Sequence, residues 1–323
     1  MNNLLKQISK YTFILFFISP AICAQQEFNY GIVSQSVINL RSNRGQEAEM
    51  GTQALMGTPV CILETVHGWN SVKTPEGYVA WTEEESVQKM NPSELKDWKT
   101  APKSIVITYF ATVRSRPSEN AEVVSDVVWG DIMRYLGKKG KYIQVQLPDG
   151  RKAFLQKSFL MPLDKWLASR RPTATNIIET ATRFIGFPYL WGGTSIKGMD
   201  CSGFTKTCFF LNGVILPRNA SDQALTGENI DITKGINRLQ PADLLFFGSI
   251  KGNKEHISHV GIYIGIGRFI HSSGMIHISS LLAGDSLYDA YNTVRLVRAQ
   301  RLITRIDVDS ALVSIKKHPF YKQ

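Results

Sequence analysis

Asp200-Cys201-Ser202-Gly203-Phe204 is the stretch of this 323-residue sequence that decides the fold of the region around it. It follows a glycine-rich segment, and aspartate is a favoured N-cap residue. Apolar residues then recur at helical spacing, at Phe204, Cys208 and Leu211. The pattern predicts a helix that begins at Cys201, where free N–H groups and the helix dipole lower the pKa of a thiol. Taken alone, the motif fits a reactive cysteine and a buried structural cysteine about equally well.

A β-hairpin is predicted downstream of this cysteine. Residues 257–264 and 268–273 alternate in the manner of strands, and Gly-Ile-Gly at 265–267 offers a turn between them. If the loop holds three residues, with Gly267 in the left-handed conformation, Ile264 pairs with Arg268. A two-residue loop would shift the register by one residue and exchange the faces of one strand.

The register of this hairpin decides whether two histidines can act together. With the three-residue loop, His259 lies opposite Ser273, and His271 points to the same face one diagonal step away. His259 is then predicted to be the base beside Cys201. His271 accepts a hydrogen bond from its other nitrogen and fixes its tautomer. Nucleophile, base and orienting group together are the arrangement of a cysteine hydrolase.

Other interpretations of these residues are weaker. A lone histidine on a strand is more often a satisfied structural residue than a catalytic one, but a capped cysteine and a second histidine of the right parity favour catalysis here. Metal binding would also use Cys and His, yet the sequence has no Cys-x-x-Cys or His-x-x-x-His pair. We predict neither a metal nor an organic cofactor.

Six motifs in order resemble the NlpC-type cell-wall cysteine peptidases. They fall within roughly residues 172–300 and are Phe187–Gly193, Asp200–Gly203, Leu216–Arg218, Pro241–Phe247, His259–Tyr263 and Phe269–His271. The resemblance implies a papain-like α+β core, with Cys201 as nucleophile, His259 as base and His271 as the polar third member. It also implies that Tyr189 lines the cleft and assists the Cys201 N–H in binding the oxyanion. Two positions depart from the family pattern, Ala242 in place of Gly and Asn219 in place of Asp.

Composition is typical of an exported protein of several domains. Residues 1–24 carry two lysines, an apolar run and a small-residue end, which predicts a signal peptide rather than a membrane span. Cys23 is an alternative lipidation site, although Ile22 lies where a small residue is preferred. Without Lys6 and Lys10 the formal net charge falls from +10 to +8, which suits an anionic wall polymer. No clustered basic stripe indicates nucleic acid, and we expect a periplasmic or extracellular monomer.

An internal repeat fills the amino-terminal half. At a shift of 73 residues, Gly57 falls on Gly130 and Trp69 on Tyr142, and both copies alternate as short strands. The glycine-tryptophan and glycine-tyrosine pattern resembles bacterial SH3-like domains, which implies two small β-barrels. The predicted organisation is a signal peptide (1–24), a first SH3-like domain (25–90), a linker helix (91–103), a second SH3-like domain (104–163), the catalytic domain (164–303) and a tail (304–323).

This domain order resembles the γ-D-glutamyl-diamino acid endopeptidases, also called dipeptidyl-peptidase VI. The resemblance implies that the first SH3-like domain covers the cleft and selects peptidoglycan stem peptides with a free amino-terminal L-alanine. Tyr78, Asp200 and Ser202 would surround the ammonium group, while Trp191, Arg218 and Ser221 line the same cleft and Arg218 suits the α-carboxylate of D-glutamate. Asp200 can equally be a helix cap only, and Tyr78 a core residue of its domain.

Three alternatives stay open at this point. One is an endopeptidase that acts on intact, acylated wall. Another is an amidase or acyltransferase on the same core, and the third is a non-catalytic wall-binding protein. An open cleft would favour the polymer, and a cleft closed by the first SH3-like domain would favour fragments.

Overall fold

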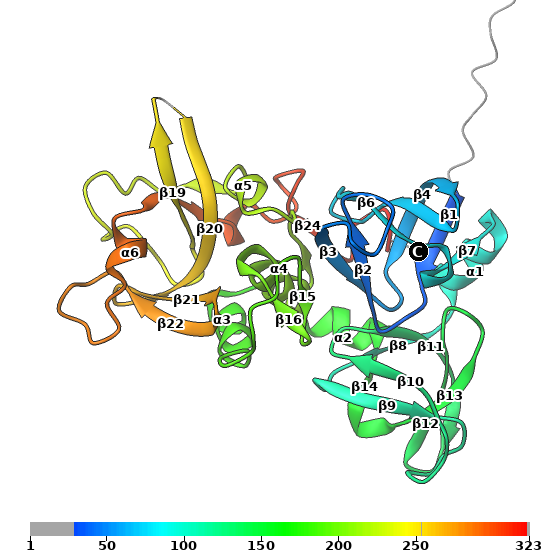
Figure 1. The fold of residues 1–323 in the computed structure, drawn as a ribbon. Helices are drawn as coiled ribbons and strands as arrows, with labels where there is room; N and C mark the ends of the chain where they lie inside the picture. The colour runs from blue at the N-terminus through cyan, green and yellow to red at the C-terminus, as the bar shows by residue number, and fades with distance from the viewer. Residues whose placement is uncertain (1–28, 253, 322–323) are drawn as a thin grey trace, which may run out of the picture.

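The computed structural model describes residues 29–252 and 254–321. The predicted signal peptide and Cys23 lie outside these residues. Two all-antiparallel sheet domains precede an α+β domain (Figure 1). None of the helices in the described ranges is both long and apolar enough to cross a membrane.

The two amino-terminal domains repeat the same sheet. The strand orders are β3-β2-β6-β5-β4-β1-β7 and β10-β9-β13-β12-β11-β8-β14. Each strand from β2 to β6 starts and ends 73 residues before its counterpart, which confirms the repeat. The first sheet comprises β1 (Asn29–Val33), β2 (Val37–Arg41), β3 (Met50–Leu55), β4 (Pro59–Val66), β5 (Trp69–Lys73), β6 (Val79–Glu83) and β7 (Val87–Met90). The second comprises β8 (Lys103–Val106), β9 (Phe110–Arg114), β10 (Val123–Val128), β11 (Ile132–Lys139), β12 (Tyr142–Gln146), β13 (Lys152–Gln156) and β14 (Leu160–Pro162).

The prediction of closed barrels was wrong. In the described residues, β3 and β7 end the first sheet and β10 and β14 end the second, so both sheets are open. Strand β7 leads directly into the linker helix, and β3 lies against the third domain, so tertiary contacts cover these edges instead of closure.

The two sheets pack against each other through equivalent turns. Gly57 and Gly130 both have positive φ, of 83° and 103°. A Cβ on Gly57 would lie 2.3 Å from the Ile132 carbonyl oxygen, and one on Gly130 would lie 2.8 Å from a methyl carbon of Leu55. Only glycine therefore allows this close approach. The buried Asp131 carboxylate also accepts a hydrogen bond from the Met56 N–H across the interface, at 3.1 Å.

A short helix, α1 (Pro92–Thr100), links the two sheets, and its start is as the sequence predicts. The Asn91 side chain accepts from the N–H groups of Ser93 and Glu94, and the Glu94 side chain accepts from the Asn91 N–H. This is a complete capping box with proline at the first helical position. The buried residues Leu95 and Trp98 fix the helix against the first sheet.

The third domain packs helices on a six-stranded antiparallel sheet of order β18-β23-β19-β20-β21-β22. Its strands are β18 (Glu228–Asn229), β19 (Leu244–Lys251), β20 (Lys254–Gly265), β21 (Arg268–Ser273), β22 (Met275–Ser280) and β23 (Leu296–Arg301). Its helices are α3 (Ala174–Thr182), α4 (Cys201–Leu211), α5 (Ala220–Gln223) and α6 (Ala290–Thr293), and the preceding α2 (Leu163–Ser169) contacts β8 and β14 of the second sheet. Two small ladders add β15 (Thr194–Ser195) with β16 (Gly198–Met199), and β17 (Val214–Ile215) with β24 (Val313–Ser314). Short 3-10 turns lie at Glu84–Ser86, Lys157–Phe159 and Ile303–Arg305.

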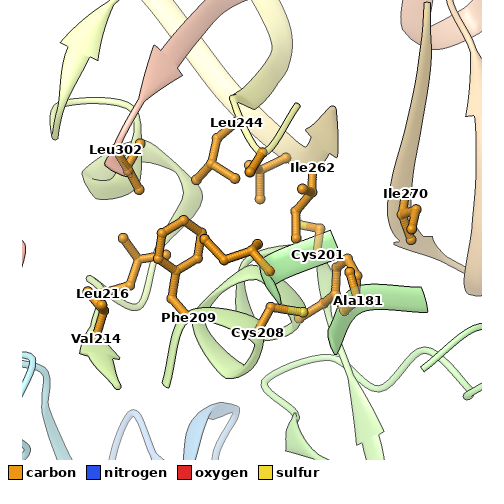
Figure 2. Packing of buried hydrophobic residues seen from close by; sticks show 14 of the residues in the cluster. Ala181, Cys201, Cys208, Phe209, Val214, Leu216, Leu244, Ile262, Ile270 and Leu302 are labelled. Carbon is orange, nitrogen blue, oxygen red and sulfur yellow. The ribbon is translucent and has the colours of Figure 1, made fainter. Parts of the chain in front are cut away.

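Helix α4 lies on one face of this sheet at the centre of the largest apolar cluster. Phe204, Cys208 and Phe209 are fully buried in it, together with Ile262 and Ile270 from β20 and β21. Figure 2 labels Cys208, Phe209, Ile262 and Ile270 in this cluster, with Cys201 near Ile262. Because the first residue of α4 is held in the core, its position against β20 is fixed by packing.

The β20–β21 hairpin has a shorter loop than predicted, but the pairing of the two strands beyond the loop is the predicted one. Gly265 pairs with Arg268, so the loop has two residues, Ile266 and Gly267, with φ of 51° and 73°. A β-bulge at Ile264 inserts one extra residue on β20, and the register returns to Gly261 opposite His271. The bulge restores the parity that a two-residue loop alone would have lost.

The carboxyl-terminal tail, to which the sequence assigned no function, is packed along the other domains. β24 pairs with β17 of the third domain. Further on, the Pro319 carbonyl accepts from Lys99 of α1 at 3.0 Å, and the Phe320 ring meets the Tyr30 ring edge-on at 6.5 Å. The tail therefore joins the third domain to the first sheet.

Candidate active site

Cys201 is the first residue of α4, as predicted. The Asp200 side chain caps the helix by accepting from the Gly203 N–H at 2.7 Å. The thiol lies at the Val260 and Ser202 N–H groups, which favour its thiolate. Burial nevertheless raises the pKa of the Cys201 thiol to about 11, and the adjacent Asp200 carboxylate adds to the rise. The expected lowering of this pKa was therefore wrong, because desolvation exceeds the effect of the helix terminus.

The two histidines form a hydrogen-bonded pair on the neighbouring strands β20 and β21. His259 Nε2 and His271 Nδ1 are 2.8 Å apart. Val260, whose N–H approaches the thiol, is the residue after His259, so the base lies on the strand that contacts the start of the nucleophile helix. Burial lowers the pKa of His259 to about 4 and that of His271 to about 3. Both imidazoles are therefore neutral at pH 7, and His259 is ready to take a proton.

Sequence reasoning missed the group that follows His271. His271 Nε2 lies 3.0 Å from the Ser279 hydroxyl on β22, and Ser279 is buried. His277, which sequence analysis did not include in the site, lies directly opposite His271 with ring centroids 4.4 Å apart. The signal was the alternation of residues 275–280, which predicts a third strand with His277 and Ser279 on one face.

Tyr189 lies beside the nucleophile. Its N–H donates to the Gly274 carbonyl at 2.9 Å, and the next residue bonds to Met199, just before the Asp200 cap. Burial raises the pKa of the Tyr189 hydroxyl to about 12, and negative charge on Cys201 or Asp200 would raise it further. The hydroxyl is thus a neutral donor near the thiol. The Cys201 N–H has no intrahelical partner because it is the first in its helix.

Asp200 and Arg218 form a buried ion pair. Arg218 Nη2 bonds Asp200 Oδ2, and Nη1 donates to Asp200 Oδ1 at 3.1 Å and to the Ser202 hydroxyl at 2.8 Å. The third nitrogen, Nε, donates to Thr52 Oγ1 at 2.9 Å. Both residues are about 5% exposed or less. We expected Arg218 to face a substrate carboxylate and Asp200 an ammonium, but here the two charges neutralise each other.

Further residues brace this pair from behind. Gln223 of α5 donates to the Ser202 carbonyl at 3.1 Å and accepts from the Thr205 hydroxyl at 2.7 Å. Gln223 was not singled out from the sequence. Ser221, which was, lies exposed on the same short helix.

The first SH3-like domain forms one wall of the site through β3 and the residue before it. Glu49 Oε1 accepts from the Trp191 indole N–H at 2.7 Å. A Cβ on Gly192 would lie 2.3 Å from the Met50 carbonyl oxygen, so the two chains touch there. Gln53 then accepts from the Thr194 N–H at 3.1 Å. Glu49 is a carboxylate at the mouth of the site that sequence reasoning missed.

Tyr78 packs on the first sheet and reaches its edge strand. Its ring packs partly buried against the core of the first sheet. Its hydroxyl reaches β3, where a Cβ on Gly51 would lie 2.4 Å away from it. Gly51 stands between Met50, which touches Gly192, and Thr52, which binds Arg218. The Tyr78 phenol therefore lies against β3, the strand that forms one wall of the site.

Comparison with known proteins agrees with this geometry. The NlpC/P60 family matches residues 186–301, and the bacterial dipeptidyl-peptidase Sh3 domain matches residues 40–87. A protein named Gamma-D-glutamyl-L-lysine dipeptidyl-peptidase from Bacillus cereus is 33% identical over 69% of this chain and 67% of its own. This chain belongs to the NlpC/P60 family.

Two further similarities cover most of the molecule. A protein of Bacillus subtilis with the same name is 31% identical over 68% of this chain and 71% of its own. The crystal structure of an NlpC/P60 family protein from Bacillus cereus superposes with a TM-score of 0.72 at 24% identity, covering 85% of this chain and 99% of that chain. The second similarity shows that the three-domain fold is shared.

One departure from the usual NlpC/P60 pattern has a structural explanation. Ala242, where the family usually has glycine, has a φ of 70°, in the left-handed region. Glycine adopts this conformation without strain, whereas alanine does not. The Ala242 N–H still donates to the Tyr263 carbonyl at 2.8 Å, so the turn into β19 is kept. The second departure, Asn219, is exposed and bonds only Asp222 among the described side chains.

No group of three or more His, Cys, Asp or Glu side chains in residues 29–252 and 254–321 has the arrangement of a metal site.

A cavity of about 780 Å³ lies away from the NlpC/P60 site, between α1, α2 and the tail. Trp98, Trp166 and Phe320 line it, and it contains none of the predicted site residues. All three cysteines in the described ranges, Cys61, Cys201 and Cys208, are free thiols.

Proposed function

We propose that this protein is a cysteine peptidase that hydrolyses the γ-D-glutamyl-diamino acid bond of peptidoglycan stem peptides with a free amino-terminal L-alanine. The observation that carries the proposal is the wall formed by β3 and Glu49 beside the Cys201–His259–His271 set. The wall contacts Trp191, Gly192 and Thr194, and the Gly192 N–H donates to the Asp200 carboxylate at 2.9 Å, so an acyl chain on Cys201 would meet the wall. A fragment that ends at L-alanine fits such a site, and a chain that continues into a glycan strand does not.

The reaction is acyl transfer through the thiol, on a core that we infer to be papain-like. His259 takes the proton of Cys201 as Sγ attacks the γ-carbonyl carbon of D-glutamate. The oxyanion receives hydrogen bonds from the Cys201 N–H and the Tyr189 hydroxyl. His259 then gives its proton to the leaving amine of the diamino acid. Water, deprotonated by His259, cleaves the thioester, and L-Ala-D-Glu leaves with its γ-carboxylate free.

The histidine relay keeps His259 in the orientation that this reaction needs. His271 and Ser279 hold the Nε2 side of His259, so Nδ1 is left for the thiol. Since the resting pair is a neutral thiol and a neutral imidazole, proton transfer accompanies attack rather than preceding it.

Recognition of the free amine falls to Glu49 and Tyr78 in this proposal. Asp200 is neutralised by Arg218, so Glu49 supplies the remaining carboxylate on the wall. A carboxylate and a phenol can hold a primary ammonium and reject an acylated nitrogen. The cap of the nucleophile helix would be fixed by Asp200, Arg218 and Ser202. The path by which substrate reaches Cys201 would be lined by Trp191 and Ser221.

We also propose that the protein is exported. The leader-like composition of residues 1–24 supports export, and the peptidoglycan substrate suits a periplasmic or extracellular site. Fractionation of cells that produce the full chain would test it, and full retention of unprocessed protein in the cytosol would contradict it. The expected monomer stays a prediction, which light scattering would check.

The test uses purified protein with L-Ala-γ-D-Glu-L-Lys and its N-acetylated form, read by mass spectrometry. We expect cleavage between D-Glu and L-Lys, slower by about tenfold or more for the acetylated peptide because it loses a charge-assisted contact. Cys201→Ala should abolish cleavage. Cys208→Ala, on the same helix and also a free thiol, should retain it.

Each other outcome selects an alternative. Equal cleavage of the two peptides keeps the peptidase but removes the amine site, and would favour an endopeptidase on intact wall. No cleavage of either peptide, with release of peptides from intact wall, would favour an amidase or endopeptidase of the polymer. Binding to wall without any cleavage would leave a binding protein.

A further inference from the structure

The leaving side of the cleft is defined by the catalytic base. Under the proposed function, His259 protonates the nitrogen of the leaving residue, so that residue must lie on the His259 side of Cys201. The acyl side is occupied by β3 and Trp191. The leaving residue would therefore meet the groups around His259 other than His271 and Ser279.

Arg295 is the cation at this position. Its Nη2 donates to the Ser258 hydroxyl at 2.6 Å, and Ser258 immediately precedes His259. A bulge in β20 places Ser258 between Ile257, which pairs with Gly248, and His259, which pairs with Phe247. Arg295 is also close enough to His259 for its charge to lower the pKa of that imidazole, after burial.

The guanidinium of Arg295 is held in place but not neutralised. Its central carbon lies 4.4 Å from the centroid of the Tyr291 ring, which is 68% exposed, and Nη1 is 3.3 Å from Asn292 Oδ1. Within the described ranges, no carboxylate lies within 4.0 Å of it. The nearby Asp289 is bonded to the N–H and the side-chain amide of Asn292 at 2.9 and 2.7 Å.

We propose that Arg295 and Ser258 form a binding site for the free α-carboxylate of the leaving diamino acid. This inference rests on the proposed function, and it specifies that the substrate peptide ends at the diamino acid. In the scissile bond the diamino acid is joined through its α-nitrogen, and one carbon separates that nitrogen from the carboxylate. A carboxylate so close to the nitrogen at His259 falls beside Ser258. The planar guanidinium fork matches a carboxylate, and Tyr291 keeps the fork oriented.

The site makes the enzyme select for chain length on the leaving side. A tripeptide that ends at the diamino acid offers a carboxylate to Arg295, whereas a longer stem peptide offers an amide there. The protein would therefore act after carboxypeptidase-type removal of the terminal residues, and it would release the free diamino acid.

The test compares L-Ala-γ-D-Glu-L-Lys with the same peptide carrying a carboxamide on lysine, in which only the α-carboxylate of lysine is removed. Lysine has a single carboxylate, so the source of any effect is unambiguous. The wild-type protein should cleave the carboxamide with a kcat/KM about ten- to a hundredfold lower. Arg295→Met should lower kcat/KM for the acid by the same factor, leave the carboxamide rate unchanged, and so abolish the discrimination.

Arg298→Met is the matched control. Arg298 lies on the following strand, β23, and its guanidinium is already paired with Glu255 at 2.6 Å, so this variant should keep the wild-type ratio. Equal wild-type rates on acid and carboxamide would overturn the inference and leave the proposed function intact. So would an Arg295→Met variant that slows both substrates alike, since that is the behaviour of a positioning residue. No cleavage of either substrate by the wild type would remove the proposed function as well.

Discussion

The two SH3-like domains share a sheet but make different contacts with the catalytic domain. In the first, the edge strand β3 and Glu49 touch Trp191, Gly192 and Thr194, next to the nucleophile. In the second, the equivalent strand β10 contributes Asp126, which pairs with the partly exposed Lys197 at 2.8 Å. That contact also includes aromatic packing of Trp129 and Tyr109 on Phe184 and Phe187, and the Tyr109 hydroxyl donates to the Arg183 carbonyl at 2.9 Å. One copy shapes the site, and the other supports the domain that holds it.

The divergence lies at equivalent positions 73 residues apart. Gly51 corresponds to Val124, and Tyr78 to Arg151. In the first copy the absence of a side chain on Gly51 leaves room for the Tyr78 hydroxyl. In the second copy Arg151 instead donates to the Val124 carbonyl at 2.8 Å. The same fold thus carries function in one copy through a small number of residues at one strand edge.

The largest expected difference between the two contacts is in stability. Arg218→Met leaves the Asp200 carboxylate buried without its partner and removes the bond to Thr52, which should cost about 3 to 5 kcal/mol of unfolding free energy. Lys197→Met breaks an exposed pair and should cost less than about 1 kcal/mol. Urea unfolding followed by tryptophan fluorescence measures both.

A milder variant keeps this comparison informative if Arg218→Met does not fold. Thr52→Val removes only the hydrogen bond to Arg218 and should cost about 1 kcal/mol. Lys197→Met could instead lower the unfolding free energy more than Thr52→Val and Arg218→Met do. The contact of the second SH3-like domain would then be the stronger of the two, contrary to this prediction.

Acidification should separate the catalytic domain from the second SH3-like domain. Unfolded histidine takes up a proton below about 6.5, whereas folded His259 and His271 do so only near pH 4 and 3. The unfolded state therefore binds more protons in this window, and stability is lost as the pH falls from 6.5 toward 4, by roughly 2 kcal/mol per histidine at pH 5. Burial raises the pKa of Asp131 in the second domain, so that carboxyl favours folding as the pH falls.

Hydrogen exchange at pH 7 and pH 5, corrected for intrinsic rates, gives the measurement. Amides of β20 and β21 should lose protection at pH 5, while those of β11 and β12 should keep theirs. Equal loss in both regions would mean that the buried histidines do not control the acid response.

The sequence predicts most of this organisation for identifiable physical reasons. The 73-residue repeat, the linker helix after Asn91 and the helix start at Cys201 are local patterns, and each is present in the structure. The Ile264 bulge was missed because an extra strand residue has no compositional mark, although the histidine parity survived. The Glu49 contact depends on how separate domains meet, and the Asp200–Arg218 pair depends on how the loop after α4 folds back onto the start of that helix, which no local spacing can show. The pKa of Cys201 was wrong in direction because burial is a tertiary property.

Exchanging the divergent residues tests whether the strand edge alone makes the first copy functional. Gly51→Val with Tyr78→Arg gives the first domain the residues of the second, so the phenol is lost and a side chain fills the space on β3 that its hydroxyl occupied. We expect kcat/KM for the free-amine peptide to fall about ten- to a hundredfold, and that for the N-acetylated peptide to stay unchanged. The reciprocal pair, Val124→Gly with Arg151→Tyr, should change neither rate. A parallel fall for both peptides would indicate general distortion of the cleft rather than loss of amine recognition.

Glu49 and Glu122 offer the smallest and most selective form of the same comparison. They are equivalent by the repeat, and in both copies the backbone carbonyl of the glutamate accepts from a serine N–H at 2.9 Å. Only Glu49 has its carboxylate on Trp191. Glu49→Gln keeps the size of the side chain and removes its charge, so the preference for the free amine over the acetylated peptide should fall by about tenfold. Glu122→Gln should leave that preference at the wild-type value. If the two variants behaved alike, the charge on β3 would not select the amine, and Tyr78 alone would remain as the contribution of the first domain to specificity.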